Sequence, residues 1–168
     1  MVGTLDVLVE RGEPSFAAFY ARWSADALRY AWAIAGADYA EDACQDAWER
    51  IWVHWDRADP DRRHAWALRI VRNSCLDRLR AGHRLTLVAD LDPGRSGDTE
   101  AEALTRLEVD ASLALLAQLS PALRECLWLR EVGQLSYAEI AEVQDVPVGT
   151  VMSRLHTARR KVARLLGR

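Results

Sequence analysis

The amino-acid sequence predicts an all-α protein, built as two small helical domains joined by a flexible linker. Ala, Leu and Arg dominate the 168 residues and runs of β-branched residues are almost absent, which favours helix. Half of the residues are apolar, so the chain can bury a modest core in each domain. Residues 81–103 interrupt the helical periodicity with Gly, Pro, Ser and Asp. We therefore expect domains at residues 1–82 and 105–168, with a linker at 83–104.

The N-terminal domain is expected to contain three helices, over residues 14–35, 40–55 and about 62–80. Each stretch repeats apolar residues every three or four positions, which is the spacing of one helix face. A break that contains Pro60 separates the second helix from the third. Six of the seven tryptophans lie before the linker, so we expect an aromatic core here and a separate, aliphatic core in the C-terminal domain.

Two aliphatic helices are expected to open the C-terminal domain. The first covers residues 103–119, and the second covers residues 120–135. Ser120 suits the N-cap of the second helix, and Pro121 suits its first helical position, where the missing N–H is not needed.

A helix-turn-helix is expected next. Ser136 and Glu139 form the pattern of a capping box at the start of a short helix over residues 136–143. The turn "QDVPVG" leads into a closing helix with six basic residues and no acidic one. Residues 148–168 therefore carry +6, and residues 1–147 carry −9. Two short helices joined by a tight turn, the second of them basic, are typical of DNA-binding proteins.

The closing helix has an apolar face and a polar face. Hydroxyl residues near its N-terminus and arginines further along suit the major groove, where Ser and Thr reach base edges or phosphates and Arg reads guanine. Taken alone, it could equally be an ordinary amphipathic helix whose late arginines complement the helix dipole. The capped helix and turn before it favour DNA binding. Arg159, at the apolar edge, is expected to pack or form a salt bridge.

The sequence contains no recognisable pattern of an enzyme, a cofactor site or a metal site. The four histidines show no HExxH or paired Cys/His spacing, and there is no glycine-rich phosphate loop. No stretch approaches the roughly 20 apolar residues that cross a bilayer, and the first residues do not resemble a signal peptide. Cys44, Cys75 and Cys126 are expected to be buried free thiols in a reducing cytosol. We expect a cytoplasmic protein that is not an enzyme.

Three segments resemble parts of one protein family. "LSPALRECLWLREVGQLSYAEIAEVQDVPVGTVMSRLHTARRKVARLL" resembles region 4 of bacterial sigma factors of the extracytoplasmic-function (ECF) group, in the sigma-70 family. "AEDACQDAWERIWVHW" resembles their region 2.2, and "HAWALRIVRNSCLDRLR" resembles their regions 2.3–2.4. The resemblance implies a protein that binds core RNA polymerase through its β′ and β subunits, directs it to promoter DNA and helps to open that DNA. In many members an anti-sigma factor holds the protein inactive.

The resemblance also implies three sets of site residues. The acidic face of region 2.2 docks on a coiled coil of β′, and such a face suits a basic protein surface better than DNA, although a merely solvated face is the alternative. Its residues here are Asp42, Gln45, Asp46, Glu49 and Trp52. The implied −10 element contacts, among which Trp66 could instead be a core residue, are Arg62, Arg63, Trp66, Arg69, Arg72, Asn73 and Arg80. The implied −35 element contacts are Thr150, Ser153, Arg154, His156, Thr157, Arg160, Lys161 and Arg164.

The sequence departs from the frequent family pattern at Met152 and Thr157, where cations are common, so the −35 sequence of better-known members is not carried over. Because the rest of the chain is acidic, we expect weak DNA binding by the isolated chain and specific binding together with core polymerase. The alternative is a stand-alone helix-turn-helix regulator whose N-terminal helices sense a ligand or dimerise.

Overall fold

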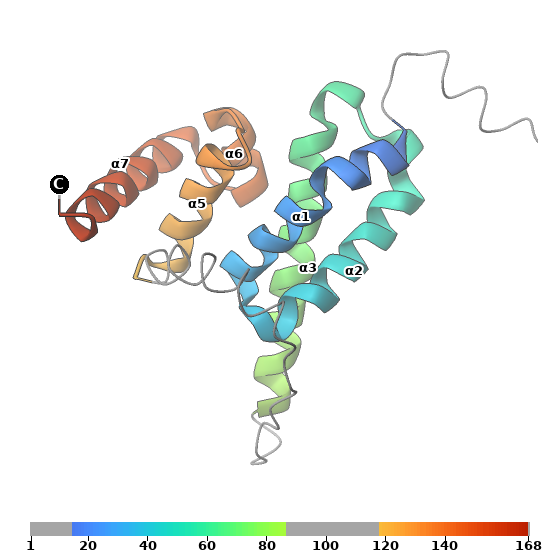
Figure 1. Ribbon diagram of the computed structural model, residues 1–168, viewed down its shortest axis with the longest axis horizontal. Helices are drawn as coiled ribbons and strands as arrows, with labels where there is room; N and C mark the ends of the chain where they lie inside the picture. Colours follow the sequence, from blue (N-terminus) through green and yellow to red (C-terminus); the bar gives the residue numbers. More distant parts are fainter. Residues whose placement is uncertain (1–14, 87–117, 168) are drawn as a thin grey trace, which may run out of the picture.

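A computed structural model describes residues 15–86 and 118–167, and this part of the chain is helical without strands (Figure 1). The N-terminal module consists of α1 (Phe16–Ala35), α2 (Ala37–His54), the 3-10 turns η1 (Trp55–Arg57) and η2 (Pro60–Arg62), and α3 (Arg63–Thr86). The C-terminal module consists of α5 (Pro121–Glu131), α6 (Tyr137–Gln144) and α7 (Val148–Leu165). Among the described residues, no helix has both the length and the apolar character needed to cross a membrane.

The helix boundaries agree in most places with those predicted from the sequence. The break around Pro60 is confirmed as the two 3-10 turns. Helix α3 continues to Thr86, past the expected start of the linker at residue 83, and the remainder of that linker lies outside the described residues. The helix expected at 103–119 also lies outside them, apart from its last two residues, which are in a turn.

Local interactions set several of these boundaries. Gly36, at φ +77°, takes a left-handed backbone conformation that glycine adopts without strain, so α1 ends there and α2 follows at once. The predicted capping box is confirmed. The Ser136 hydroxyl accepts a hydrogen bond from the Glu139 N–H at 3.2 Å, and the Glu139 carboxylate accepts one from the Ser136 N–H at 2.7 Å. Asp145, at φ 54° and ψ 54°, ends α6 and makes the turn into α7.

The expected aromatic core lies between α1 and the end of α2. Phe19 and Trp55 are buried, with ring centroids 5.1 Å apart, and Phe16 meets the Trp55 ring edge-on at 5.4 Å. Ile51 and Ala67 complete this cluster. Aromatic pairs in such geometries add packing energy beyond the area they bury, so this cluster holds the three helices of the N-terminal module together.

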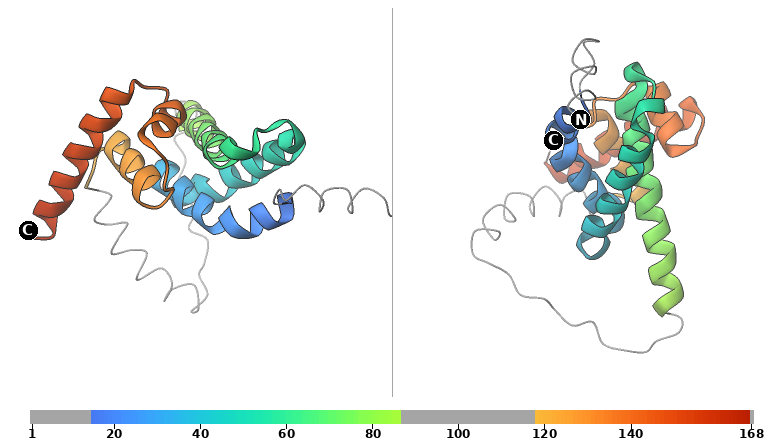
Figure 2. Two further views of the ribbon diagram at one scale, coloured as in Figure 1. Left: turned by 90° about the horizontal axis from the view of Figure 1, so that it is seen from above. Right: turned by 90° about the vertical axis from the view of Figure 1, so that its right-hand side faces the viewer.

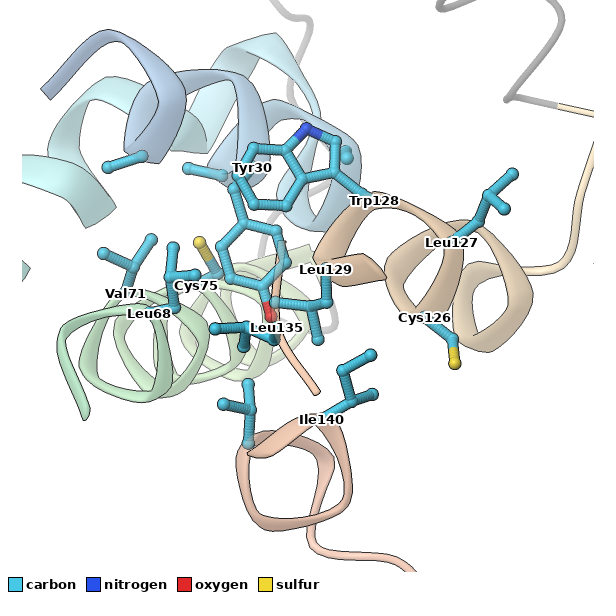
Figure 3. Packing of buried hydrophobic residues seen from close by; sticks show 14 of the residues in the cluster. Tyr30, Leu68, Val71, Cys75, Cys126, Leu127, Trp128, Leu129, Leu135 and Ile140 are labelled. Atoms are coloured by element: carbon cyan, nitrogen blue, oxygen red, sulfur yellow. The ribbon is translucent and has the colours of Figure 1, made fainter. Parts of the chain in front are cut away.

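The expectation of two separate cores is wrong, because one buried cluster runs through both modules. Helix α5 packs on α1, and α6 packs on α3 (Figures 1 and 2). At the centre of this contact Tyr30 of α1 is fully buried, and its ring stacks on Trp128 of α5 with centroids 4.6 Å apart (Figure 3). Tyr30 belongs to the predicted apolar stripe of its helix, but Trp128, the ring that it stacks on, lies in the other module.

His64 forms a second contact between the modules. Its ring lies 3.7 Å from the ring of Trp23, and its Nε2 lies 3.0 Å from the Gly133 carbonyl oxygen in the turn between α5 and α6. Burial lowers the pKa of His64, and nearby Arg22 acts in the same direction, while the Gly133 carbonyl, Glu139 and Asp26 oppose them. The folded chain therefore favours the neutral imidazole.

This pKa predicts a loss of stability in mild acid. Above pH 6.5 the imidazole is neutral in both folded and unfolded chains, whereas below it the unfolded chain binds a proton that the folded chain resists. The melting temperature of the natural chain should therefore fall more between pH 7.5 and about 5.5 than that of a His64→Gln variant. His54→Gln, at an exposed position on α2, serves as the control and should keep the natural pH profile. Identical profiles for all three proteins would contradict the prediction.

Candidate functional site

Helix α2 presents an acidic face with both free and paired carboxylates. Glu49 and Gln45 are exposed. Asp46 is half-buried and accepts from Arg78 of α3 at 2.6 Å, and the same arginine reaches Asp42 at 3.4 Å. The structure therefore brings four predicted polymerase contacts to one face, where Arg78 neutralises part of the charge.

An apolar groove lies beside this acidic face. It has a volume of about 620 Å³ and runs between α1 and α2, with Trp52, the fifth predicted polymerase contact, at its rim and 62% exposed. Gln45 and Glu49 line the same groove. The large apolar side chains of the groove are Phe16, Tyr20, Leu28, Trp48 and Trp52. Carboxylates next to exposed aromatic side chains can bind an amphipathic basic protein segment.

The predicted −10 contacts lie along α3, from Arg63 to Arg80, and at Arg62 in the 3-10 turn before it. Arg62, Trp66 and Arg69 line a cavity of about 280 Å³. Arg57 of η1 lines it as well, and sequence reasoning missed this residue although it belongs to the same basic loop, "DRADPDRR". Three guanidinium groups around an indole ring can bind phosphate and stack against a base.

Arg63 differs from its neighbours in this set. It is only 5% exposed, its guanidinium lies 4.2 Å over the Trp55 ring, and it donates a hydrogen bond to the Ala58 carbonyl at 3.4 Å. The residue therefore fixes the 3-10 turns against the aromatic core. In this arrangement its side chain does not face solvent where DNA could reach it.

Two arginines of the −10 set form ion pairs with the C-terminal module. The Arg72 Nε donates to Glu125 of α5 at 2.6 Å, and Arg62 pairs with Glu142 of α6. Glu125 is 7% exposed and also accepts from the Tyr30 hydroxyl at 2.9 Å. Burial and the Glu125 carboxylate raise the pKa of Tyr30 well above its usual range, so the phenol stays protonated and donates.

The remaining two residues of the −10 set lie further along α3. Asn73 is exposed. Arg80 is also exposed and contacts Asp77 of its own helix at 3.3 Å. The seven residues thus form no single patch: three line the cavity, one is buried, one is paired with α5 and two are exposed along α3.

Helix α7 buries one face and exposes the other. Val151, Leu155 and Ala158 are buried as predicted, while Val148 and Leu166 at the two ends of the predicted stripe are exposed. Arg159 binds Glu131 of α5 through two nitrogens, at 2.8 and 3.2 Å, which confirms its expected salt bridge. Arg154 is half-buried and donates to Gln144 of α6 at 2.9 Å.

The outer face of α7 carries most of the predicted −35 contacts. Thr150 is half-buried, and its carbonyl accepts a hydrogen bond from the Ser153 hydroxyl at 2.9 Å. The exposed members of the set are Ser153, His156, Thr157, Arg160, Lys161 and Arg164. Helix α7 lies on the far side of the C-terminal module from α2 (Figure 2). A basic, hydroxyl-bearing helix of this kind fits a DNA groove.

The three thiols are free and buried, as predicted. Burial raises the pKa of Cys44 and Cys75 to about 12 and that of Cys126 to about 11, so the thiols stay protonated and poorly nucleophilic. Within residues 15–86 and 118–167, no three His, Cys, Asp or Glu side chains cluster as a metal site would require.

Comparisons with known proteins place both modules in one family. A family model described as Sigma-70 region 2 matches residues 19–85, and one described as Sigma-70, region 4 matches residues 111–162. The ECF RNA polymerase sigma factor SigW of Bacillus subtilis is 30% identical over 142 residues, covering 76% of this chain and 75% of that protein. The ECF RNA polymerase sigma factor SigL of Mycobacterium tuberculosis is 35% identical over 152 residues, covering 84% of this chain and 82% of SigL.

Solved structures show the same fold. The sigma factor RpoE of Bartonella quintana, solved in complex with the anti-sigma factor NepR, has a TM-score of 0.66 at 24% identity and covers 89% of this chain and 96% of its own. CnrH, solved in complex with the cytosolic domain of CnrY, has a TM-score of 0.65 at 27% identity. The match covers 90% of this chain and 87% of CnrH. Both regions are matched in order, and the two relatives are covered over most of their length. The chain therefore belongs to the ECF sigma factors of the sigma-70 family, which are non-enzymatic proteins that direct RNA polymerase to promoters to initiate transcription.

Proposed function

We propose that the three surfaces divide the work of this sigma factor between them: α2 holds core polymerase, the start of α3 takes the −10 element, and the outer face of α7 reads the −35 element. The observation that carries this assignment is the separation of charge. Helix α7 exposes basic residues and contains no acidic one, and α2 exposes acidic side chains beside an apolar groove. Three arginines line the α3 cavity, together with Asp59 and Glu142. In this division the N-terminal module acts as region 2 and the C-terminal module as region 4.

Core polymerase meets the groove between α1 and α2. Trp52 provides the apolar anchor, since a large exposed aromatic side chain at the centre of an interface contributes more than its neighbours. Glu49 and Gln45 remain available beside it, whereas Asp42 and Asp46 share their charge with Arg78. The residues proposed to touch polymerase are thus Trp52, Glu49 and Gln45 first, with the two aspartates around them.

Promoter opening is assigned to the cavity of Arg57, Arg62, Trp66 and Arg69. An indole between arginines suits an unstacked base of single-stranded DNA, whose phosphates the guanidinium groups neutralise. Arg63 supports the turn from within and is left out of the DNA-contact set. Asn73 and Arg80 extend the surface along α3.

The −35 element is assigned to Ser153, His156, Thr157, Arg160, Lys161 and Arg164, which face outward on α7. Arg154 links α7 to α6 through Gln144 and so holds the reading helix in place. We place this work in the cytoplasm, where polymerase and chromosome meet. The structure of RpoE solved with the anti-sigma factor NepR supports control of this chain by a protein of that kind.

Run-off transcription with reconstituted core polymerase on genomic fragments tests the function as a whole. The chain should yield transcripts from a discrete set of start sites that core polymerase alone does not produce. The isolated chain should bind the same fragments weakly, because its net charge is −3. Tight, sequence-specific binding by the chain alone, without transcription, would favour the stand-alone regulator instead.

Truncating Trp52 should weaken the complex with core polymerase. We expect Trp52→Ala to raise the Kd about 30-fold, because aromatic anchors contribute about 2 kcal/mol or more. Val53→Ala is the matched control, since Val53 is adjacent and 70% exposed but lies outside the proposed set. Fluorescence anisotropy of a labelled chain titrated with core polymerase measures both. Equal losses in the two variants would contradict the assignment of Trp52.

Alanine substitutions at two adjacent arginines of α7 should have different effects on transcription. Arg160→Ala removes a proposed DNA contact and should lower transcription from the identified promoters about 5- to 100-fold, the range of a lost base contact. Arg159→Ala removes the exposed pair with Glu131 and a hydrogen bond with Tyr137, neither of them a proposed DNA contact, and should change transcription about two-fold at most. A larger effect from Arg159→Ala than from Arg160→Ala would place the reading face elsewhere on the helix.

A further inference from the structure

We propose that this chain associates with copies of itself head to tail, with the last turns of α7 of one copy lying in the groove between α1 and α2 of the next. The inference goes beyond the proposed function, because it gives both surfaces a second partner. The contact covers the groove assigned to polymerase in one copy and part of the α7 face assigned to the −35 element in the other.

The groove calls for an occupant that is both apolar and basic. Exposed aromatic side chains, among them Tyr20 and Trp52, line it together with the carboxylates of Glu41 and Glu49. Both glutamates are exposed, and neither forms an ion pair within the part of the chain that the structure describes. A segment that buries apolar side chains on the rings and brings cations to the carboxylates therefore complements the groove.

The last turns of α7 have this combination. Leu165 and Leu166 are 41% and 58% exposed, and Lys161 and Arg164 are exposed beside them. Helix α7 contains no acidic residue that could repel the carboxylates of the groove. Neither leucine belongs to the proposed DNA-contact set, so reading the −35 element does not account for their exposure. A partner with aromatic side chains and carboxylates does.

The occupant of the groove must come from another copy. Helix α7 lies on the far side of the C-terminal module from α2, so with the modules in this arrangement its last turns cannot enter the groove of their own copy (Figures 1 and 2). The distribution of charge favours the head-to-tail order, since residues 148–168 carry +6 and residues 1–147 carry −9. Because two different surfaces meet, each copy can accept one neighbour and be accepted by another, which gives open chains of copies.

The association is expected to be weak and reversible. A contact made by two helical turns is smaller than the roughly 1,200 Å² at the lower end of stable protein interfaces. Core polymerase, which fills the same groove, therefore separates the copies by mass action. Duplex DNA bound to α7 acts in the same direction. Associated chains thus form a reserve that polymerase draws on.

Sedimentation velocity of the full chain, over a concentration series in the micromolar range, tests the proposal. At about 50 mM salt the weight-average sedimentation coefficient should rise with concentration. At about 500 mM salt the rise should be much smaller, because salt screens exposed charges.

Three exposed positions provide matched variants. Glu49→Lys reverses a charge in the groove, and Arg164→Glu reverses one on α7. Asp61→Lys, in η2 and outside both surfaces, changes the net charge as Glu49→Lys does and serves as the control. Circular dichroism confirms that the helices persist in all three.

We expect Glu49→Lys and Arg164→Glu each to raise the apparent Kd of association about 10-fold, since like charges then face each other. Asp61→Lys should stay within about two-fold of the natural chain. An equimolar mixture of the Glu49→Lys and Arg164→Glu chains should associate as the natural chain does, because the substituted groove of one then faces the substituted α7 of the other.

Several results would overturn the proposal. One is a sedimentation coefficient that does not change with concentration at low salt. Another is an equal loss in Asp61→Lys, which would make net charge the cause. A loss in Glu49→Lys without one in Arg164→Glu, or a mixture that fails to associate, would mean that the groove does not meet α7. Sedimentation uses the chain alone, so these results are independent of run-off transcription, which tests the sigma function.

Discussion

The arrangement of the two modules depends on one buried polar group, the carboxylate of Glu125. It is removed from water, so it requires partners, and both partners come from the other module: Arg72 and the Tyr30 hydroxyl. The stack of Tyr30 on Trp128 surrounds these bonds with apolar surface. A buried charge tolerates little displacement, so the contact sets the register of α5 against α1 and α3 and thereby the position of α6 over the cavity.

Local sequence signals predicted the elements well, because each depends on residues a few positions apart. The capping box of Ser136 and Glu139, the proline at the start of α5 and the break before α3 are interactions within one turn of chain. The closing helix was predicted from its periodicity, and only the two ends of its apolar stripe, Val148 and Leu166, differ, since no element within the described ranges covers them.

The contact between the modules could not be predicted in the same way. Tyr30 and Glu125 are 95 positions apart, and neither has a distinctive sequence context: one belongs to an ordinary apolar stripe, and the other is one acid among many. The same limit applies to the site. Sequence resemblance assigned Arg63 and Arg62 alike to DNA, but only three-dimensional packing separates a guanidinium buried on Trp55 from one at the rim of a cavity.

The exposed aromatic groove between α1 and α2 has a consequence for the amount of protein that a cell can hold. Trp52 and Tyr20 leave an apolar surface in water whenever polymerase is not bound. Surfaces of this kind promote self-association and recruit chaperones and proteases. Chains produced in excess of free polymerase are therefore prone to aggregation and degradation. The abundance of this sigma factor then depends on the supply of a protein that covers the groove.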